Sequence, residues 1–392
     1  MLGFLTLSPA PTASDIPPFL CLLCSDRAVA DAVANVLLFL PLGVLLNLNG
    51  LWLREALLAA LALSGSIEAL QFLVPGRFPD LSDVLTNGGG GALGVIVGRR
   101  SDRWILPSSP WRPRLFVGML ALATALPFAV GLLLTPVVPE GRLWTLWTPQ
   151  MPHLELWGGR LQVVELGGSP LLHARPLSPD QVAALRTGRP LRLEGEAGTA
   201  PDGLAPVLRI VDDVGTEARL VAVRGTDLIW LARNRAQRLF LDSPELRWEG
   251  ALAGLSPGAP LEIRVEPGPE GVCMRVGEAS ACGLGHHAGR GWAILLSVRS
   301  LPGRIHRLLD RFWIGGVLLL VGFWTPPGAR AGAFLGLLLP LTALVLSGGS
   351  PSLMAVPWTG FLAGAAGWFL GWRAGSSPAL QALHHSFRES RE

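Results

Sequence analysis

The sequence predicts an α-helical polytopic membrane protein with an extracytoplasmic, jelly-roll-like all-β sandwich inserted in its middle. Three observations support this fold class. Half of the 392 residues are hydrophobic and 16% are charged, which is more apolar than an average soluble domain. Long apolar runs near both ends approach the roughly 20 residues that cross a bilayer. Between them, short apolar stretches alternate with polar residues, as strands do.

Seven apolar segments predict the helices of the membrane part. They are residues 34–48, 51–74, 81–97, 115–134, 312–324, 331–346 and 353–372. The first three precede a basic loop, and the last three form a second apolar block that we expect to anchor the chain. The opening LTLSPAP resembles the end of a helix, so we expect that Met1 is not the true start or that a first span is lost.

Arginines predict how these segments are oriented. The sequence contains no lysine, and five of its arginines lie in the loop 99–114, so the positive-inside rule places this loop in the cytoplasm. The long middle region then lies outside. Four arginines at the outer end of segment 312–324 oppose this orientation, but long translocated domains are largely exempt from the rule. They are Arg299, Arg304, Arg307 and Arg311. The arginines form no basic stripe with interleaved aromatics, so nucleic acid is not an expected partner.

The middle region predicts an antiparallel sandwich of short strands separated by Gly, Pro and Asp. The expected strands include residues 207–213, 219–223, 228–233, 238–242, 261–265 and 292–298. Residues 178–188 predict a short helix or a loop, with Ser178 as the N-cap.

The cysteines predict one disulfide. If Gly277 and Glu278 form a two-residue turn, Cys273 lies opposite Cys282 in a non-hydrogen-bonded pair, with Cα atoms roughly 4.5 Å apart. Two buried thiols are the alternative. For Cys21 and Cys24, apolar packing is preferred over redox or metal chemistry, because no second ligand pair follows.

Polar residues are concentrated at the ends of two predicted helices. Glu68 and Gln71 share one helical face, and Asp83 and Asn87 share another. The short connection between the helices makes them antiparallel neighbours, so these side chains should lie together near the outer leaflet. The expected cluster is Asn35, Glu68, Gln71, Arg77, Asp83 and Asn87.

The cluster has a structural alternative, in which Asp80 and Asp83 cap the second helix. We prefer capping for Asp80 and a functional site for Glu68, Asp83 and Arg77, because an Asp at a membrane helix centre costs about 2.5–3.5 kcal/mol. Gly90, Gly94 and Gly98 repeat every four residues, which predicts close helix packing without chemistry.

Three pieces of the chain resemble the VanZ-like membrane proteins: NVLLFLPLG at 35–43, IEALQFLVPGR at 67–77 and SDVLTNGGGGALG at 82–94. The resemblance covers about residues 1–100, and the family's polar positions fall on the six residues of the expected cluster. It implies a bacterial protein of the cytoplasmic (inner) membrane. The family's name comes from resistance to the glycopeptide teicoplanin.

The middle region resembles laminin G-like and concanavalin A-like domains through PVLRIVDD at 206–213, RLVAVRGTDLIWLARN at 219–234 and the hairpin that ends in CMRVGE. Such domains often bind carbohydrate, sometimes with Ca²⁺. Asp212 and Asp213 could ligate that cation or form a turn, and Trp230 could stack on a sugar or pack in the core. No other cofactor is expected. The His286–His287 pair is interpreted as structural or exposed.

The expected organisation has five parts. They are a VanZ-like helical membrane domain (1–100), a cytoplasmic basic loop with a spanning helix (101–136), an extracytoplasmic β-sandwich (137–305), C-terminal transmembrane helices (306–373) and a cytoplasmic tail (374–392).

Two functions fit these features. In the first, the cluster binds a membrane lipid headgroup or a lipid-linked cell-wall precursor, and the sandwich binds glycan. In the second, the chain is an intramembrane enzyme, with Glu68 or Asp83 as acid or base and Arg77, Asn35, Gln71 and Asn87 holding the substrate. A transporter is disfavoured, because the other apolar segments contain no matching polar cluster.

Overall fold

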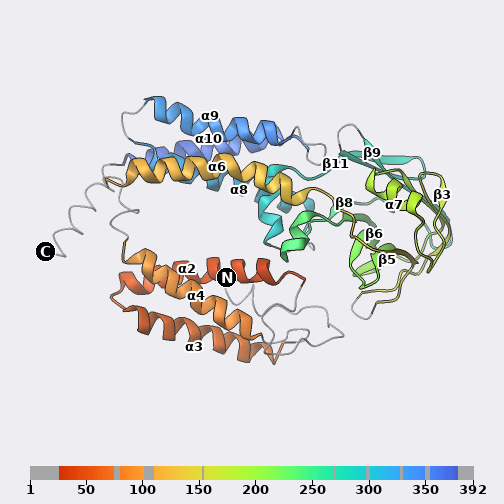
Figure 1. Ribbon diagram of the computed structural model, residues 1–392, viewed down its shortest axis with the longest axis horizontal. Helices are drawn as coiled ribbons and strands as arrows, with labels where there is room; N and C mark the ends of the chain where they lie inside the picture. Colours follow the sequence, from red (N-terminus) through yellow and green to blue (C-terminus); the bar gives the residue numbers. More distant parts are fainter. Residues whose placement is uncertain are drawn as a thin grey trace.

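The computed structural model describes residues 26–74, 80–100, 110–151, 154–268, 271–296, 301–326, 330–348 and 354–377. Two groups of helices and one β-sandwich make up this part of the chain, and both helical groups lie to the same side of the sandwich (Figure 1). Arg77, Cys21 and Cys24 lie outside the described residues.

The N-terminal group contains α2 (Ala28–Leu48), α3 (Leu53–Gln71) and α4 (Leu81–Gly98). Glycines bring α4 against α2. A methyl group on Gly90 would lie 2.6 Å from the carbonyl oxygen of Val36, and one on Gly94 would collide with the carbonyl oxygen of Leu40. The predicted packing role of these glycines is therefore confirmed. Helix α2 begins six residues before its predicted start, because the charged Asp31 interrupts the apolar run while the alanines around it favour a helix.

The C-terminal group contains α6 (Arg112–Leu134), α8 (Gly303–Trp324), α9 (Arg330–Ser347) and α10 (Trp358–Gly375). Glycines of α10 touch the backbone of α8. A methyl group on Gly367, Gly371 or Gly375 would collide with a carbonyl oxygen of that helix. Helix α8 begins nine residues before the predicted apolar segment, because its first turns are rich in arginine.

Two of the described helices, α2 and α6, are long and apolar enough to cross a membrane by length and composition. Helix α9 contains a shorter apolar stretch. The buried Arg112 at the start of α6 donates to backbone carbonyls at the C-terminal ends of α8 and α10, so α6 is fixed to both helices.

Two antiparallel sheets form the middle region. One sheet has the order β1-β5-β6-β7-β8 and the other β11-β10-β9-β4-β2-β3. The strands are β1 (Leu143–Trp147), β2 (Arg160–Leu166), β3 (Ser169–Pro170), β4 (Leu191–Glu196), β5 (Leu204–Asp212), β6 (Glu217–Arg224), β7 (Asp227–Ala232), β8 (Leu246–Trp248), β9 (Pro260–Gly268), β10 (Gly271–Val276) and β11 (Ala279–Leu284).

Buried side chains of both sheets share one core. Val207 and Ile210 of the first sheet pack in the same cluster as Leu193, Ile263 and Met274 of the second. The middle region is therefore β-sheet-rich, with two sheets packed on a common core. Its assignment as a jelly-roll stays a prediction.

Two expected strands are wrong. Residues 238–242 overlap the 3-10 helix η1 (Arg235–Leu239), and residues 292–298 overlap the 3-10 helix η2 (Ala288–Ile294). Their apolar residues do not belong to the sandwich core. Leu241 and Ile294 pack in one cluster with Val130 of α6 and Ala30 of α2, so burial against helices replaces strand pairing.

The short helix α7 (Pro179–Arg186) begins as predicted, because the hydroxyl of Ser178 accepts from the backbone N–H of Gln181. The side chain of Gln181 in turn accepts from the backbone N–H of Ser178, which completes a capping box.

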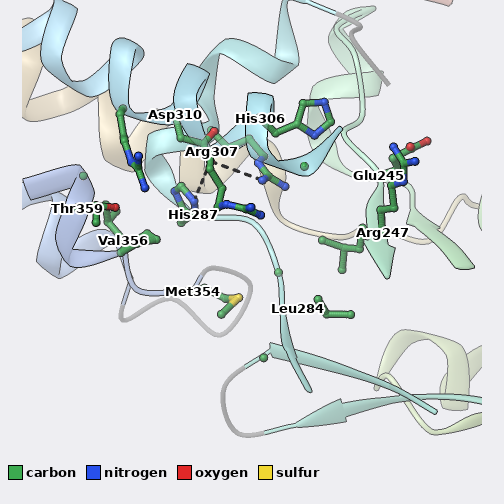
Figure 2. Close-up of a pocket in the computed structure, with 18 of the residues that line it drawn as sticks. Glu245, Arg247, Leu284, His287, His306, Arg307, Asp310, Met354, Val356 and Thr359 are labelled. Carbon is green, nitrogen blue, oxygen red and sulfur yellow. Dashed lines mark ion pairs between the residues drawn. The ribbon is translucent and has the colours of Figure 1, made fainter. Parts of the chain in front are cut away.

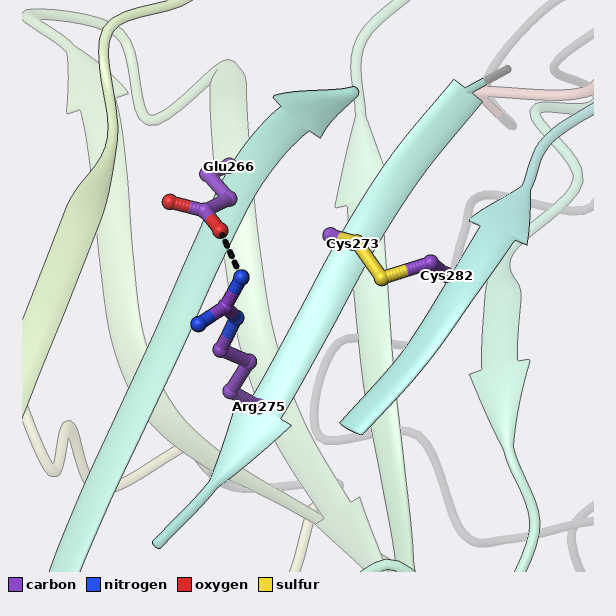
Figure 3. Close-up of a disulfide and its surroundings, with 4 residues drawn as sticks. All are labelled: Glu266, Cys273, Arg275 and Cys282. Atoms are coloured by element: carbon purple, nitrogen blue, oxygen red, sulfur yellow. Dashed lines mark ion pairs between the residues drawn. A yellow bond between two sulfur atoms is a disulfide. The ribbon is translucent and has the colours of Figure 1, made fainter. Parts of the chain in front are cut away.

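The predicted disulfide between Cys273 and Cys282 is confirmed (Figure 3). The two Cα atoms lie 4.0 Å apart. Met274 pairs with Ala281 and Val276 with Ala279, as the two-residue turn requires. The register shifts between Met274 and Val272, the interval that contains Cys273.

Candidate functional site

The candidate site lies where α3 ends and α4 begins. Asn35 of α2 joins it through its side-chain amide, which donates to the carboxylate of Asp83 at 2.8 Å. The same amide also lies 3.3 Å from the hydroxyl of Thr86, one turn further along α4. Because α2 and α4 touch along their glycines, these short side chains can span the gap between the two helices. The predicted proximity of Asn35 and Asp83 is thus a direct hydrogen bond.

Glu68 of α3 forms a hydrogen bond at the N-terminus of α4. Its carboxylate accepts from the backbone N–H of Asp80 at 2.8 Å. The side chain of Asp80 accepts in turn from the backbone N–H of Ser82, so the predicted capping role of Asp80 is confirmed. Both carboxylates therefore lie at the positive end of the α4 dipole, where acidic side chains stabilise a helix. Glu68 is 5% exposed, and this dipole offsets part of its desolvation.

Asn87 lies one helical turn below Asp83 and is 5% exposed. Its amide nitrogen donates to the hydroxyl of Ser64 on α3 at 2.8 Å. Its carbonyl oxygen Oδ1 is shielded from solvent and has no hydrogen-bond partner in the described part of the chain. An unsatisfied buried acceptor costs about 1–3 kcal/mol, and such groups in proteins often mark an absent water, ion or ligand.

Gln71, the last residue of α3, is also 5% exposed and lies on the face of Glu68. The structure thus gathers Asn35, Glu68, Gln71, Asp83 and Asn87 at one end of the N-terminal helices. Sequence reasoning did not include Ser64 and Thr86 in the site. Each is one turn from a predicted member on the same helix, and this spacing was the available signal.

The site is rich in hydrogen-bond acceptors. Asp83 accepts from Asn35 and Glu68 from the backbone, whereas the Oδ1 atom of Asn87 has no partner among the described residues. Such a set suits a ligand that offers N–H or O–H groups. Among the described residues, no group of three or more His, Cys, Asp or Glu could hold a metal ion.

The sandwich residues singled out in the sequence have structural partners. Asp212 accepts from the backbone N–H groups of Val214 and Thr216, so it forms the turn after β5. Asp213 accepts from the indole of Trp144, and Trp230 packs against the sandwich core. His287 is buried and lies 3.3 Å from Asp310 of α8, so it joins the sandwich region to the C-terminal helices.

Three closely packed helices, of which α2 is long and apolar enough to cross a membrane, carry a polar cluster at one end. Comparison with known proteins shows what this helical domain is similar to. Residues 6–101 match the family model VanZ/LLP1. Protein VanZ of Enterococcus faecium is 32% identical over 104 residues, which cover 26% of this chain and 65% of that relative. The N-terminal part is therefore VanZ-like, and the chain spans just under two thirds of this relative. No solved structure matches the chain significantly.

The match ends directly after α4. The basic loop, the sandwich and the C-terminal helices all lie beyond it. The likeness to VanZ supports a membrane protein of the cell envelope, and it carries no information on the remaining three quarters of the chain.

Proposed function

We propose that the VanZ-like domain binds the headgroup of a membrane lipid or of a lipid-linked cell-wall precursor through Asn35, Glu68, Gln71, Asp83 and Asn87. The observation that supports this most is the unsatisfied Oδ1 atom of Asn87, in a cluster that also contains the buried Glu68 and the half-buried Asp83. A hydroxyl or amino group of a ligand would satisfy that acceptor. Sugars and amine-bearing headgroups offer such donors, and a lipid can reach helix ends that face the membrane surface.

Arg77 belongs to this proposal through the family resemblance alone. It follows Glu68 and Gln71 on the connection between α3 and α4. A guanidinium there would bind the phosphate that envelope lipids and lipid-linked precursors share.

The wider proposal concerns topology. The chain would be a multi-pass protein of the bacterial cytoplasmic membrane, with the basic loop 99–114 inside and the sandwich outside. The disulfide of the β10–β11 hairpin supports an oxidising location for the sandwich. In this arrangement the sandwich would meet surface glycan, and the protein would contribute to resistance against glycopeptides such as teicoplanin. A cytoplasmic reporter fused near residue 220 that proved active would contradict this topology.

Binding can be tested with protein purified from bacterial membranes. Native mass spectrometry of the wild type should show a co-purified lipid or precursor, and Glu68→Gln and Asn87→Leu should lose it. Glu55→Gln is the matched control, because Glu55 caps the opposite end of α3 by accepting from the backbone N–H of Trp52. Equal occupancy in the wild type and the two site variants would refute the proposal.

The alternative is an intramembrane enzyme that uses Glu68 and Asp83 as acid and base. Two carboxylates from different helices in one cluster favour it, because general acid–base catalysis needs a proton donor and a proton acceptor within reach of one substrate. Lipid analysis of a deletion strain decides between the two functions. A modified lipid that requires Glu68 and Asp83 would establish an enzyme. If the variant proteins are stable and the lipids are the same with and without them, the enzyme is refuted and the binding function is supported.

A further inference from the structure

A cavity of about 480 Å³ lies where the sandwich meets the C-terminal helices, beyond the VanZ-like segment. Its walls come from β8, the end of β11, the approach to η2, the first turns of α8 and the stretch that leads into α10. Figure 2 shows His287, Arg307 and Asp310 on one side, with Leu284 and Met354 across from them. The cavity therefore has a polar side and an apolar side.

The carboxylates of this cavity are already engaged. Glu245 accepts from Arg224 at 2.8 Å, and Glu249 accepts from the backbone N–H of Gly303 at 2.8 Å. Asp310 accepts from the indole of Trp292 at 2.7 Å. Glu245 and Asp310 thus have a cationic partner nearby, whereas the backbone N–H on Glu249 is neutral and leaves the charge of that carboxylate at the start of α8.

Part of the positive charge is engaged in the same way. Arg247 is bound to Asp227, and Arg290 lies 3.5 Å from Asp310. Arg307 and Arg311 differ from these arginines. Both are exposed, both line the cavity, and neither forms an ion pair with any residue that the structure describes. They are four residues apart on α8, so their guanidinium groups rise from one face.

The same face of α8 becomes apolar one turn further on. Ile314 follows Arg311 after three residues, lines the cavity and is 3% exposed. Val356, which is 5% exposed, and Met354 extend this apolar wall from the stretch before α10. Arg307 and Ile314 are separated by seven residues, or roughly 10 Å along the helix axis. A ligand that fills the cavity would meet cations at one end and hydrocarbon at the other.

We propose that this cavity binds an anionic amphiphile, with a phosphate on Arg307 and Arg311 and its apolar part against Ile314, Met354 and Val356. Guanidinium groups are suited to phosphate, because their planar N–H groups bind two oxygens at once. The site is separate from the cluster around Asp83. Its ligand chemistry follows from the lining, and only its position at the outer membrane surface depends on the proposed topology.

The test uses full-length protein in a neutral detergent. Short-chain phosphatidic acid is the probe, short-chain phosphatidylcholine is the zwitterionic comparison, and inorganic phosphate is the headgroup without a chain. Arg307→Gln and Arg311→Gln, combined in one variant, should weaken phosphatidic acid binding roughly tenfold or more. Arg304→Gln is the matched control, because Arg304 is exposed on the same helix and does not line the cavity.

Each outcome has a definite meaning. Tight binding of phosphatidic acid that is lost in the double variant and kept in the Arg304 control supports the proposal. Inorganic phosphate that binds as tightly as phosphatidic acid would indicate a free-phosphate site and overturn the amphiphile. Binding that is absent, or equal in all variants, would also overturn the proposal. Glu68→Gln should leave this binding unchanged, so a failure here is distinguishable from a failure of the VanZ-like site.

Discussion

Replacing Gly94 by alanine tests whether backbone contact holds the N-terminal helices together. Gly94 lies on the face of α4 that touches α2. A methyl group at this position would collide with the carbonyl oxygen of Leu40, lie 2.8 Å from the Cα atom of Gly43 and lie 2.9 Å from the backbone nitrogen of Val44. All three atoms belong to the backbone of one helix, so the clash is relieved only if α2 moves away from α4.

The size of the effect follows from two opposing terms. Alanine in place of glycine stabilises a helix by about 1 kcal/mol. Overpacking of a close contact destabilises by about 1–3 kcal/mol, and a backbone clash belongs at the upper end of that range. Gly89 lies on the same helix, and a methyl group there meets no atom within 4 Å. Gly89→Ala therefore keeps the gain without the clash, and the two variants should differ by about 1–3 kcal/mol.

Thermal unfolding in detergent, followed by size-exclusion chromatography, measures the difference. Gly94→Ala should lose the folded peak several degrees below the wild type, while Gly89→Ala should unfold at or above the wild-type temperature. Separation of α2 from α4 would also break the hydrogen bond from Asn35 to Asp83, so ligand retention should fall with stability. A Gly94→Ala protein as stable as Gly89→Ala would refute the packing argument.

Three further predictions address the rest of the molecule. Arg112→Leu removes the donor to carbonyls at the ends of α8 and α10 and should destabilise the protein by about 2 kcal/mol or more in thermal unfolding, whereas Arg114→Leu should have little effect. Reduction, or Cys273→Ser with Cys282→Ser, should lower stability by up to about 3 kcal/mol, measured as earlier unfolding of the sandwich. Burial lowers the pKa of His286 from 6.5 to about 3. As the pH falls, His286 is protonated near pH 6.5 in the unfolded chain but only near pH 3 in the folded chain. The free energy of unfolding should therefore be highest above pH 6.5 and fall as the pH drops toward 3. In unfolding measured over this pH range, His286→Gln should flatten the dependence.

The polar cluster could be predicted from the sequence because helical periodicity fixes which residues share a face. Glu68 and Gln71 are three apart, and Asp83 and Asn87 are four apart. The short connection between the helices then brings both faces to one end of the bundle. The partner of each side chain could not be predicted. Asn35 meets Asp83 only because the glycines of α4 bring α2 into backbone contact, which is a tertiary effect.

The strand predictions failed where apolar residues bury against helices instead of a second sheet. Residues 238–242 and 292–298 have the apolar content of strands, but Leu241 and Ile294 pack with α2 and α6. Alternation along a sequence does not reveal which surface buries a side chain. The cavity lined by Arg307 could not be predicted for a related reason, because its walls come from five separate segments. The sequence showed only that several arginines lie close together before segment 312–324.

The contact between η1 and α2 has a consequence for the VanZ-like site. The backbone N–H of Ala30 donates to the carbonyl of Phe240 at 3.2 Å, and Arg27 lies 3.5 Å from Asp242. Ala30 and Asn35 belong to the same helix, five residues apart, so the segment after η1 holds one end of the helix that supplies Asn35. Glycine contacts with α4 hold the other side of that helix. The geometry of the site therefore depends on residues beyond the matched segment, and residues 6–101 alone would lack one of the two supports of α2.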